Sequence, residues 1–180
     1  MIGEASSYIL SEVKEALDKV DPATAEAMVD AIIVAKKIFV YGVGRSGVVG
    51  KAFSVRLVQM GLDVHFIGDT TTPIVEKGDL VLIVSNTGET MSAVQTANIV
   101  GRIGSTVVTI TSNQNSKLGR ASKIVVEISS RRNDDKARLA PLGTLFEAAA
   151  FIFLDSLVPP LMQKLEQTES LMRKRHAIWV

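Results

Sequence analysis

The polar and apolar residues at the start of the chain alternate with the period of two amphipathic helices. Ile9 and Val13 fall on one face of the first segment. Asp21 and Pro22 then form a pair that typically opens a helix, an N-cap carboxylate followed by proline at the first helical position. The pattern therefore predicts two N-terminal helices within residues 1–36.

Beyond these helices the pattern changes to short apolar runs rich in β-branched residues. Five runs are continuous enough for strands buried on both faces, at residues 38–41, 64–67, 80–84, 106–110 and 124–128. Helical patterns follow three of these runs, at residues 46–60, 89–102 and 116–121. The predicted fold class is α/β, a five-stranded parallel sheet in a flavodoxin-like three-layer α/β/α sandwich with extra N- and C-terminal helices. Ligands of such sheets bind beyond the carboxyl ends of the strands.

The most apolar part of the chain comes after the predicted sheet, at residues 139–162. Glu147, Asp155 and the Pro159-Pro160 pair interrupt it. A membrane span requires about twenty nearly unbroken apolar residues, so we interpret this stretch as a buried helix and expect no membrane partner. A helix that is apolar on most of its faces must be covered all round. The sheet can cover one side, and either a partner chain or the two N-terminal helices must cover the other. We favour a partner chain and therefore expect a homo-oligomer.

Length and composition exclude several kinds of chemistry. The 180 residues are 47% hydrophobic and 22% charged, and a formal net charge of +1 supplies no broad basic surface for nucleic acid. There is no cysteine, which removes disulfides and Cys-based metal sites, and there are only two histidines, so we expect no metal. We expect a cytoplasmic protein. Residues 1–180 should form a single domain, with N-terminal helices at 1–36, an α/β core at 37–130 and C-terminal helices at 141–180.

Three polar loops follow predicted strands or precede the apolar helix. The first, Gly42-Val43-Gly44-Arg45-Ser46-Gly47, has the G-x-G-x-x-G spacing of dinucleotide-binding turns. Its context fits a nicotinamide-dependent oxidoreductase poorly, because the acid expected after the second strand is Asp69, which lies beyond Gly68. A Walker loop fails as well, since Ala52 follows Gly50-Lys51. The structural alternative is a tight turn that requires positive φ at glycine.

The second loop is Ser85-Asn86-Thr87-Gly88-Glu89-Thr90, between a buried strand and a helix. Backbone N–H groups and the helix dipole favour an anion at such a position, and the hydroxyls add donors. The loop is therefore a candidate site for a single phosphate. Plain N-capping is the alternative, but one cap needs one such residue and the loop holds three hydroxyls.

The third site is Pro141-Leu142-Gly143-Thr144-Leu145-Phe146-Glu147, where the apolar helix begins. Apolar surroundings disfavour a charged carboxylate, so we expect the pKa of Glu147 to rise towards neutrality, which suits a general base. The alternative is an exposed glutamate that the helix dipole stabilises. In the tail, His176 is a candidate proton shuttle or part of a solvated basic run, whereas His65, within a strand, is more typical of a structural histidine.

Taken together, the three loops resemble those of the sugar isomerase (SIS) domain family. Within it, Gly68-Asp69-Thr70-Thr71-Thr72-Pro73 and Lys174-Arg175-His176 resemble the 6-phospho-3-hexuloisomerase branch, and the resemblance covers essentially the whole chain. It implies a cofactor-independent ketose-phosphate isomerase of the ribulose monophosphate pathway. Such enzymes interconvert 3-hexulose 6-phosphate and fructose 6-phosphate through a cis-enediol, as dimers or tetramers with sites near subunit interfaces.

The resemblance also implies roles for individual residues. Ser85, Asn86, Thr87 and Thr90 would hold the phosphate, Ser46 would lie near the sugar, Glu147 would act as base, and His176 would act as acid or base, reaching a neighbouring subunit. We assign Arg45 and the region of Gly44 and Ser46 to stabilisation of the oxyanion that develops in such a reaction. Many members carry serine at the position of Thr87, and the hydroxyl is kept here. Three alternatives stay open: a non-catalytic module that binds sugar phosphate, an SIS isomerase for another ketose or aldose phosphate, and a nicotinamide-dependent oxidoreductase, which rests on the glycine spacing of the first loop.

Overall fold

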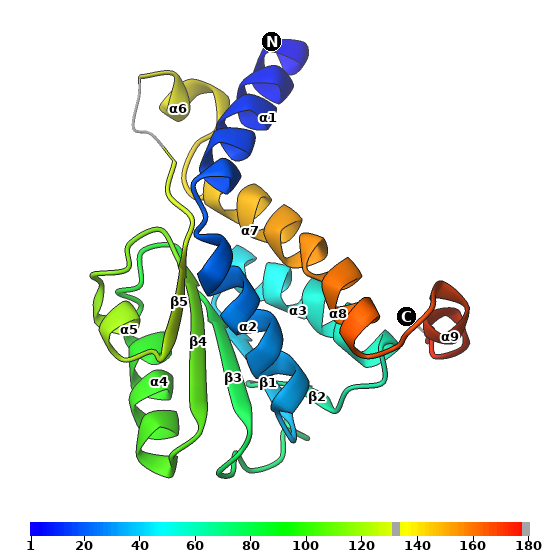
Figure 1. Ribbon diagram of the computed structural model, residues 1–180. Coiled ribbons are helices and arrows are strands. Elements are labelled where there is room, and N and C mark those ends of the chain that lie inside the picture. Colours follow the sequence, from blue (N-terminus) through cyan, green and yellow to red (C-terminus); the bar gives the residue numbers. More distant parts are fainter. Residues whose placement is uncertain (131–133, 178–180) are drawn as a thin grey trace.

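The central sheet confirms the predicted fold class. The computed structural model describes residues 1–130 and 134–177. In this part of the chain the sheet has five strands, β1 (Ile38–Gly42), β2 (Val64–Phe66), β3 (Leu80–Val84), β4 (Thr106–Thr111) and β5 (Ile124–Glu127). All neighbours pair in parallel in the order β2-β1-β3-β4-β5, which is the flavodoxin-like order (Figure 1).

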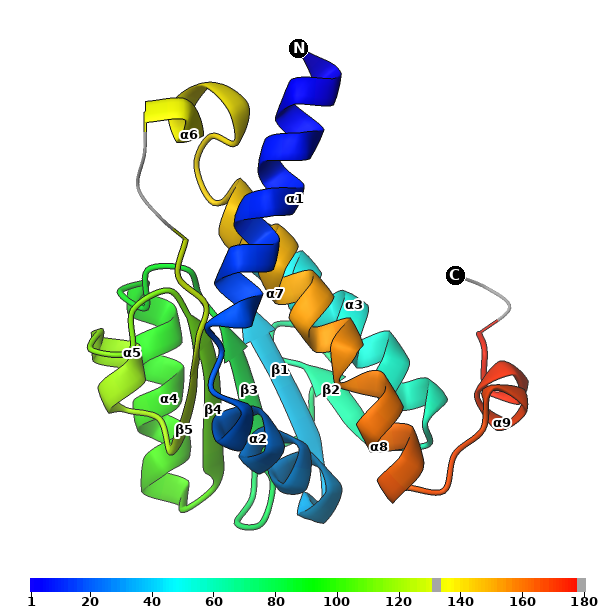
Figure 2. The same ribbon diagram turned by 45° about the horizontal axis from the view of Figure 1, so that its top comes forward.

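Helices cover both faces of the sheet (Figures 1 and 2). The described residues form α1 (Ile2–Asp18), α2 (Pro22–Val34), α3 (Arg45–Gln59), α4 (Met91–Ile103), α5 (Lys117–Arg120), α6 (Asp134–Leu139), α7 (Thr144–Ser156), α8 (Val158–Lys164) and α9 (Glu169–Lys174). Alternate residues of β3 serve the two layers, because successive strand side chains point to opposite faces. Leu80 and Leu82 join the core beneath α2, α3 and α7, whereas Val81 and Ile83 join the core beneath α4.

The two N-terminal helices form as predicted. The Asp21 carboxylate accepts hydrogen bonds from the backbone N–H groups of Ala23 (3.3 Å) and Thr24 (3.1 Å), which caps α2. A hydrogen bond from the Thr24 hydroxyl is the largest cause of the lowered pKa of Asp21, and the two backbone hydrogen bonds lower it further. Helix α1 extends beyond the sheet and packs against α7 (Figure 2).

The long apolar helix is divided into two. Helix α7 ends at Ser156 and α8 begins at Val158, with Pro159 and Pro160 in the first turn, where proline is tolerated. The 21 residues 144–164 are long and apolar enough to cross a membrane by length and composition, and 44% of their most apolar window is buried. Phe146 and Leu154 belong to the core. The predicted tail residues 178–180 lie outside the described residues.

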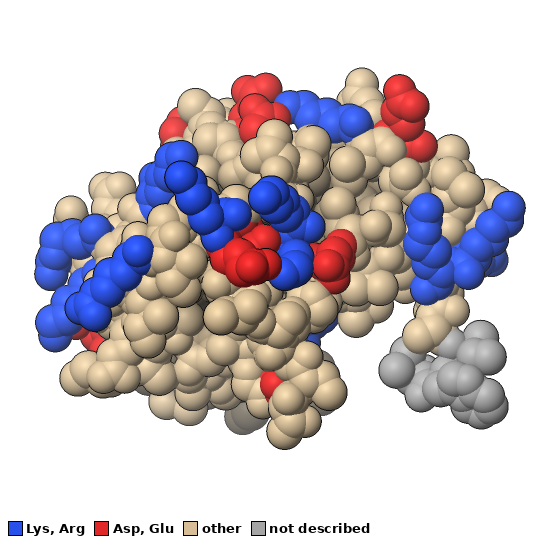
Figure 3. Space-filling model, turned by 90° about the horizontal axis from the view of Figure 1, so that it is seen from below, with Lys and Arg blue, Asp and Glu red and all other residues tan. Residues whose placement is uncertain are grey.

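Charges of both signs adjoin on the surface. In Figure 3, which views the molecule from below, acidic and basic side chains meet in the middle of the face. One ion pair joins Lys37 to Glu76 at 3.1 Å. The electrostatic field of each charge is locally opposed by its neighbour, and this face offers no uniform basic surface.

Candidate active site

Two of the three polar loops meet at the carboxyl edge of the sheet and enclose a small cavity. Its volume is about 140 Å³, and its lining comprises Val43, Ser46, Val84, Ser85, Asn86, Thr87, Thr90 and Ala93. The structure thus brings together Ser46 and the four residues predicted to hold a phosphate. Gly44 and Arg45 lie next to Ser46, at the exposed start of α3.

Close backbone packing explains the glycines of the first loop. A Cβ atom on Gly47 would lie 2.4 Å from the Gly42 carbonyl oxygen, and Gly44 has a φ of 59°. Both positions therefore require glycine, as the tight-turn interpretation proposes. The turn places Ser46, only 8% exposed, in the cavity and leaves the Arg45 side chain 74% exposed.

Hydrogen bonds to neighbouring segments fix the second loop. The Asn86 carbonyl oxygen accepts from the Ser112 N–H (2.9 Å), the Ser112 hydroxyl (2.8 Å) and the Thr111 hydroxyl (3.0 Å). Gly88, with a φ of 65°, approaches α5 so closely that a Cβ atom would lie 2.1 Å from Ser116 Oγ. The end of β4 and the start of α5 therefore hold the loop in place.

Glu89 reinforces this attachment, a role that nothing in the sequence pattern signals. Its carboxylate accepts a hydrogen bond from the Lys117 backbone N–H (3.0 Å) and pairs with the Lys117 ammonium (3.0 Å). The backbone hydrogen bond is the largest of the causes that lower the pKa of Glu89. Glu89 therefore binds the first residue of α5, whose N-cap is Ser116, and helps to support the loop.

The hydroxyls of the second loop are not used to cap helix α4. Thr90 is the N-cap residue of α4, yet its side chain makes no capping hydrogen bond within the described residues. Thr87 Oγ1 accepts from the Glu89 N–H at 3.2 Å, which leaves its own proton to donate. The first turn of α4 thus keeps N–H groups that an anion in the cavity can use.

The Glu147 carboxylate lies beside the second polar loop. A Cβ atom on Gly143 would be 2.9 Å from Glu147 Oε1 and 3.4 Å from Asn86 Nδ2, so the two side chains are neighbours across this glycine. The Arg45 guanidinium pairs with Glu147 Oε2. The Glu147 side chain is 12% exposed, and the adjacent Phe146 and Ala150 are buried. The apolar surroundings predicted for Glu147 are present, and Arg45 of the first loop adds a cationic partner.

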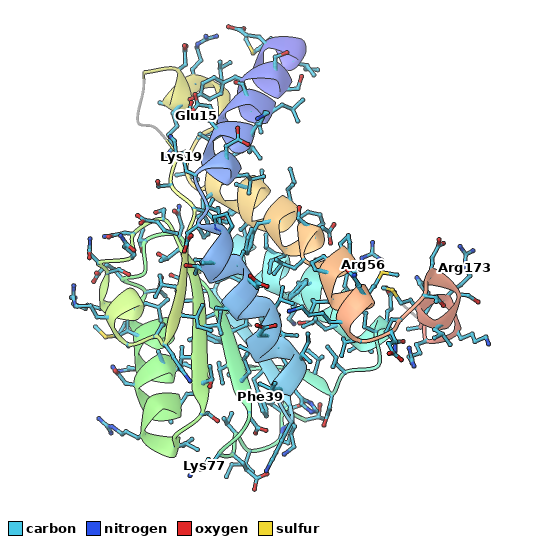
Figure 4. All side chains as sticks on the ribbon, in the orientation of Figure 1. Glu15, Lys19, Phe39, Arg56, Lys77 and Arg173 are labelled. Atoms are coloured by element: carbon cyan, nitrogen blue, oxygen red, sulfur yellow. The ribbon has the colours of Figure 1, made fainter. Side chains whose placement is uncertain are left out.

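His176 lies far from these residues within one chain. It follows α9, which packs against the last turn of α3, where the Arg175 guanidinium donates to the Gln59 carbonyl oxygen at 3.1 Å. In Figure 4 the labelled Arg56 of α3 and Arg173 of α9 mark this end of the molecule. Helix α3 has 15 residues, and at 1.5 Å per residue roughly 20 Å separates its two ends. The role of His176 stays a prediction.

His65 has structural partners. Its Nε2 lies 2.9 Å from an Asp63 oxygen, and its ring packs on Phe39 with 5.4 Å between centroids. These contacts agree with the structural interpretation of this histidine. Among the described residues, no group of three His, Asp or Glu side chains is arranged to hold a metal ion.

Comparison with known proteins adds the decisive observation. The SIS domain family matches residues 31–151. The chain belongs to the SIS domain family. A Methanocaldococcus jannaschii relative named 3-hexulose-6-phosphate isomerase is 38% identical over 152 residues, which are 84% of this chain and 81% of the relative. A Bacillus subtilis relative of the same name is 31% identical over 97% of this chain and 96% of its own.

Solved SIS structures superpose over nearly the whole chain. One from Methanococcus jannaschii, with an inferred function of 3-hexulose-6-phosphate isomerase, has a TM-score of 0.85 and 31% identity, and covers 95% of this chain and 98% of its own. An Escherichia coli protein in complex with A5P has a TM-score of 0.79 at 20% identity, over 98% of this chain and 97% of its own, and shares the fold. The resemblance to SIS domains that the loops carry is therefore confirmed.

Proposed function

We propose that this SIS domain is a 3-hexulose-6-phosphate isomerase that interconverts 3-hexulose 6-phosphate and fructose 6-phosphate without a cofactor. The observation that carries the proposal is the position of the Glu147 carboxylate beside Asn86 of the hydroxyl-lined loop. A base and an anion site are thus neighbours in one chain. The relatives named for this reaction, at 31% and 38% identity, support the choice of substrate.

In this proposal the cavity between α3 and α4 holds the phosphate. Ser46, Ser85, Thr87 and Thr90 supply hydroxyl donors around it, and the first turn of α4 supplies backbone N–H groups. The phosphate is remote from the carbons that react. Its binding energy can therefore fix the register of the sugar against Glu147 and lower the barrier of the chemical step.

Glu147 is the proposed base. Oε2 pairs with Arg45, which leaves Oε1, on the Gly143 side, to take the proton from C2 of the 3-ketose. The electrons of the C2–H bond form a C2–C3 double bond, and the C3 carbonyl oxygen takes up the negative charge. The proton of the C2 hydroxyl passes to the C3 oxygen, and return of the other proton from Glu147 to C3, as the C2 carbonyl forms, gives the 2-ketose. Such positioned acid–base catalysis contributes about 10²–10⁴-fold.

The proposal extends to a cytoplasmic homo-oligomer, a dimer or tetramer, in which His176 of one subunit approaches the site of another. Supporting it, the adjoining helices α3 and α7 expose apolar side chains beside the site, Val48 (67%), Val55 (51%), Phe151 (44%) and Ile152 (41%). A second copy would cover this surface. Mixing two inactive variants, Glu147→Gln and His176→Asn, should restore activity if the histidine crosses between subunits.

The reaction itself is tested by NMR with fructose 6-phosphate in D₂O. We expect deuterium to enter at C3 while a 3-ketose signal appears. Exchange at C1 alone would instead identify an isomerase for an aldose and a ketose. Binding of the sugar phosphate without any exchange would identify a non-catalytic binding module and overturn the proposal.

A further inference from the structure

A cavity of about 340 Å³ lies between the edge strand β2, helix α3 and the residues that follow α9 (Figure 1). Among the described residues, its lining has no member in common with that of the cavity between α3 and α4. Small-molecule sites typically have volumes of about 300–1,000 Å³ and apolar walls with a few placed polar groups. The lining of this cavity therefore indicates which ligand it fits.

One wall of the cavity is apolar and open to solvent. Val58 of α3 and Val64 and Phe66 of β2 form this wall. Val58 is 45% exposed, although the adjacent Leu57 is completely buried. Val64 and Phe66 lie two residues apart on the strand, so their side chains point to the same face of the sheet, and both are half-buried. The apolar part of a ligand would remove this surface from water.

An ion pair adjoins the apolar wall. The Lys51 ammonium lies 4.3 Å from the centre of the Phe66 ring and 3.3 Å from Asp69 Oδ1, and all three residues belong to the lining. His65, also in the lining, has its Nε2 2.9 Å from Asp63 Oδ1. The Lys51–Asp69 pair therefore contributes polarity to the cavity without a net charge.

Arg175, by contrast, faces neutral acceptors. Its Nη1 donates to the Gln59 carbonyl oxygen at 3.1 Å and to Gln167 Oε1 at 2.8 Å. The guanidinium also packs on Gly61, where an added Cβ atom would lie 3.1 Å from Arg175 Cζ. In the described part of the chain, no carboxylate forms an ion pair with Arg175. The cavity thus has a fixed cation whose Nε and Nη2 can donate to an anion.

We propose that this cavity is a second ligand site, which binds a small organic monoanion made of an apolar body and one carboxylate. The apolar body would contact Val58, Val64 and Phe66, and the carboxylate would accept hydrogen bonds from Arg175. The charge of one guanidinium matches a single negative charge, and its planar set of donors matches the geometry of a carboxylate. The inference goes beyond the proposed isomerase and does not depend on it.

The probe for this site is 2-naphthoate, which joins a rigid apolar body to one carboxylate, and 2-naphthalenemethanol is its neutral counterpart. Calorimetry should show that 2-naphthoate binds and that the neutral probe binds about tenfold more weakly, because it lacks the charged hydrogen bond. Amide NMR should show changes at Val58 and Phe66 and none at Thr87. Saturating inorganic phosphate should leave the affinity for 2-naphthoate unchanged.

Variants test the two parts of the site separately. Arg175→Gln should weaken 2-naphthoate binding by about 10–100-fold, the range for a hydrogen bond to a charged group, and Arg175→Lys should weaken it less, because the charge is kept. Val58→Ala should weaken it by about fourfold, the contribution of one buried methylene group. The matched control is Arg102→Gln, at an exposed position in the last turn of α4, which should bind as the unaltered protein does. Thermal melting shows whether each variant is folded.

Several results would overturn the inference. Equal affinities for the two probes, or unchanged 2-naphthoate binding in folded Arg175→Gln, would mean that Arg175 does not select the ligand. Displacement by inorganic phosphate would place 2-naphthoate in the cavity between α3 and α4. If 2-naphthoate does not bind, or binds more weakly as the protein concentration rises, the chain itself or a second copy closes the cavity and the proposed site does not exist.

Discussion

Two loops connect a strand to a helix at the carboxyl edge of the sheet, and they obtain their shape in different ways. The loop between β1 and α3 is shaped by its own glycines, since Gly42 and Gly47 pack backbone against backbone. The loop between β3 and α4 is shaped by its neighbours, because the Asn86 carbonyl and the Glu89 carboxylate are bonded to segments that follow β4.

The two loops also differ in what their polar groups contact. The glycine-shaped loop presents Arg45 to Glu147, which lies 102 residues further along the chain. The neighbour-supported loop keeps its hydroxyls and N–H groups directed to a cavity. A turn that its own glycines shape can position a side chain for catalysis. A loop whose polar groups are left for a ligand needs hydrogen bonds from neighbouring segments to hold its shape.

The largest expected effect is that of Glu147→Gln, which removes the group that both loops flank. Turnover should fall by about 10²–10⁴-fold, since the amide takes no proton from carbon. The affinity for inorganic phosphate should stay within about twofold, because no phosphate ligand is changed. Steady-state kinetics and calorimetry would measure the two quantities. Glu26→Gln, an exposed site on α2, is the control, and full turnover in Glu147→Gln would remove this residue from the role of base.

Gly47→Ala should break the glycine-shaped loop. The new Cβ atom would lie 2.4 Å from the Gly42 carbonyl oxygen, so the free energy of unfolding should fall by about 3 kcal/mol, the upper range for overpacking. Urea denaturation provides the measurement. Gly101→Ala, in α4 with open space around the added atom, should instead gain about 0.5–1 kcal/mol. Similar stabilities for the two variants would contradict the packing argument.

The sequence predicts features that depend on residues close together in the chain, and it misses contacts between segments that are far apart in the chain. Continuous β-branched runs reveal the five strands of the described sheet, and Asp21-Pro22 reveals the start of α2, because these signals lie within a few residues. The hydroxyl loop is found in the same way. The Arg45–Glu147 pair and the Glu89–Lys117 contact join segments that periodicity does not relate.

Thr90→Val tests whether the second loop serves a ligand or its own helix. The Thr90 hydroxyl makes no capping bond within the described residues, so the free energy of unfolding should change by less than about 0.5 kcal/mol, against about 1 kcal/mol for loss of a cap. The affinity for inorganic phosphate should weaken by about tenfold, through loss of one charge-assisted hydrogen bond. Thr96→Val, whose hydroxyl donates to the Ser92 carbonyl oxygen in the same helix, is the matched control for phosphate affinity.

Glu89→Gln should have the smallest effect and should depend on pH. The Lys117 backbone N–H and ammonium lower the pKa of Glu89 in the folded protein below its unfolded value. Its contribution to stability is therefore present above the unfolded pKa, which is about 4.3, and is lost as pH falls through the folded pKa. Chemical denaturation from pH 7 to pH 3 should show the stabilities of the two proteins converging at the acid end. A difference that stays constant over this range would mean that the charge of Glu89 does not tether the loop between β3 and α4 to α5.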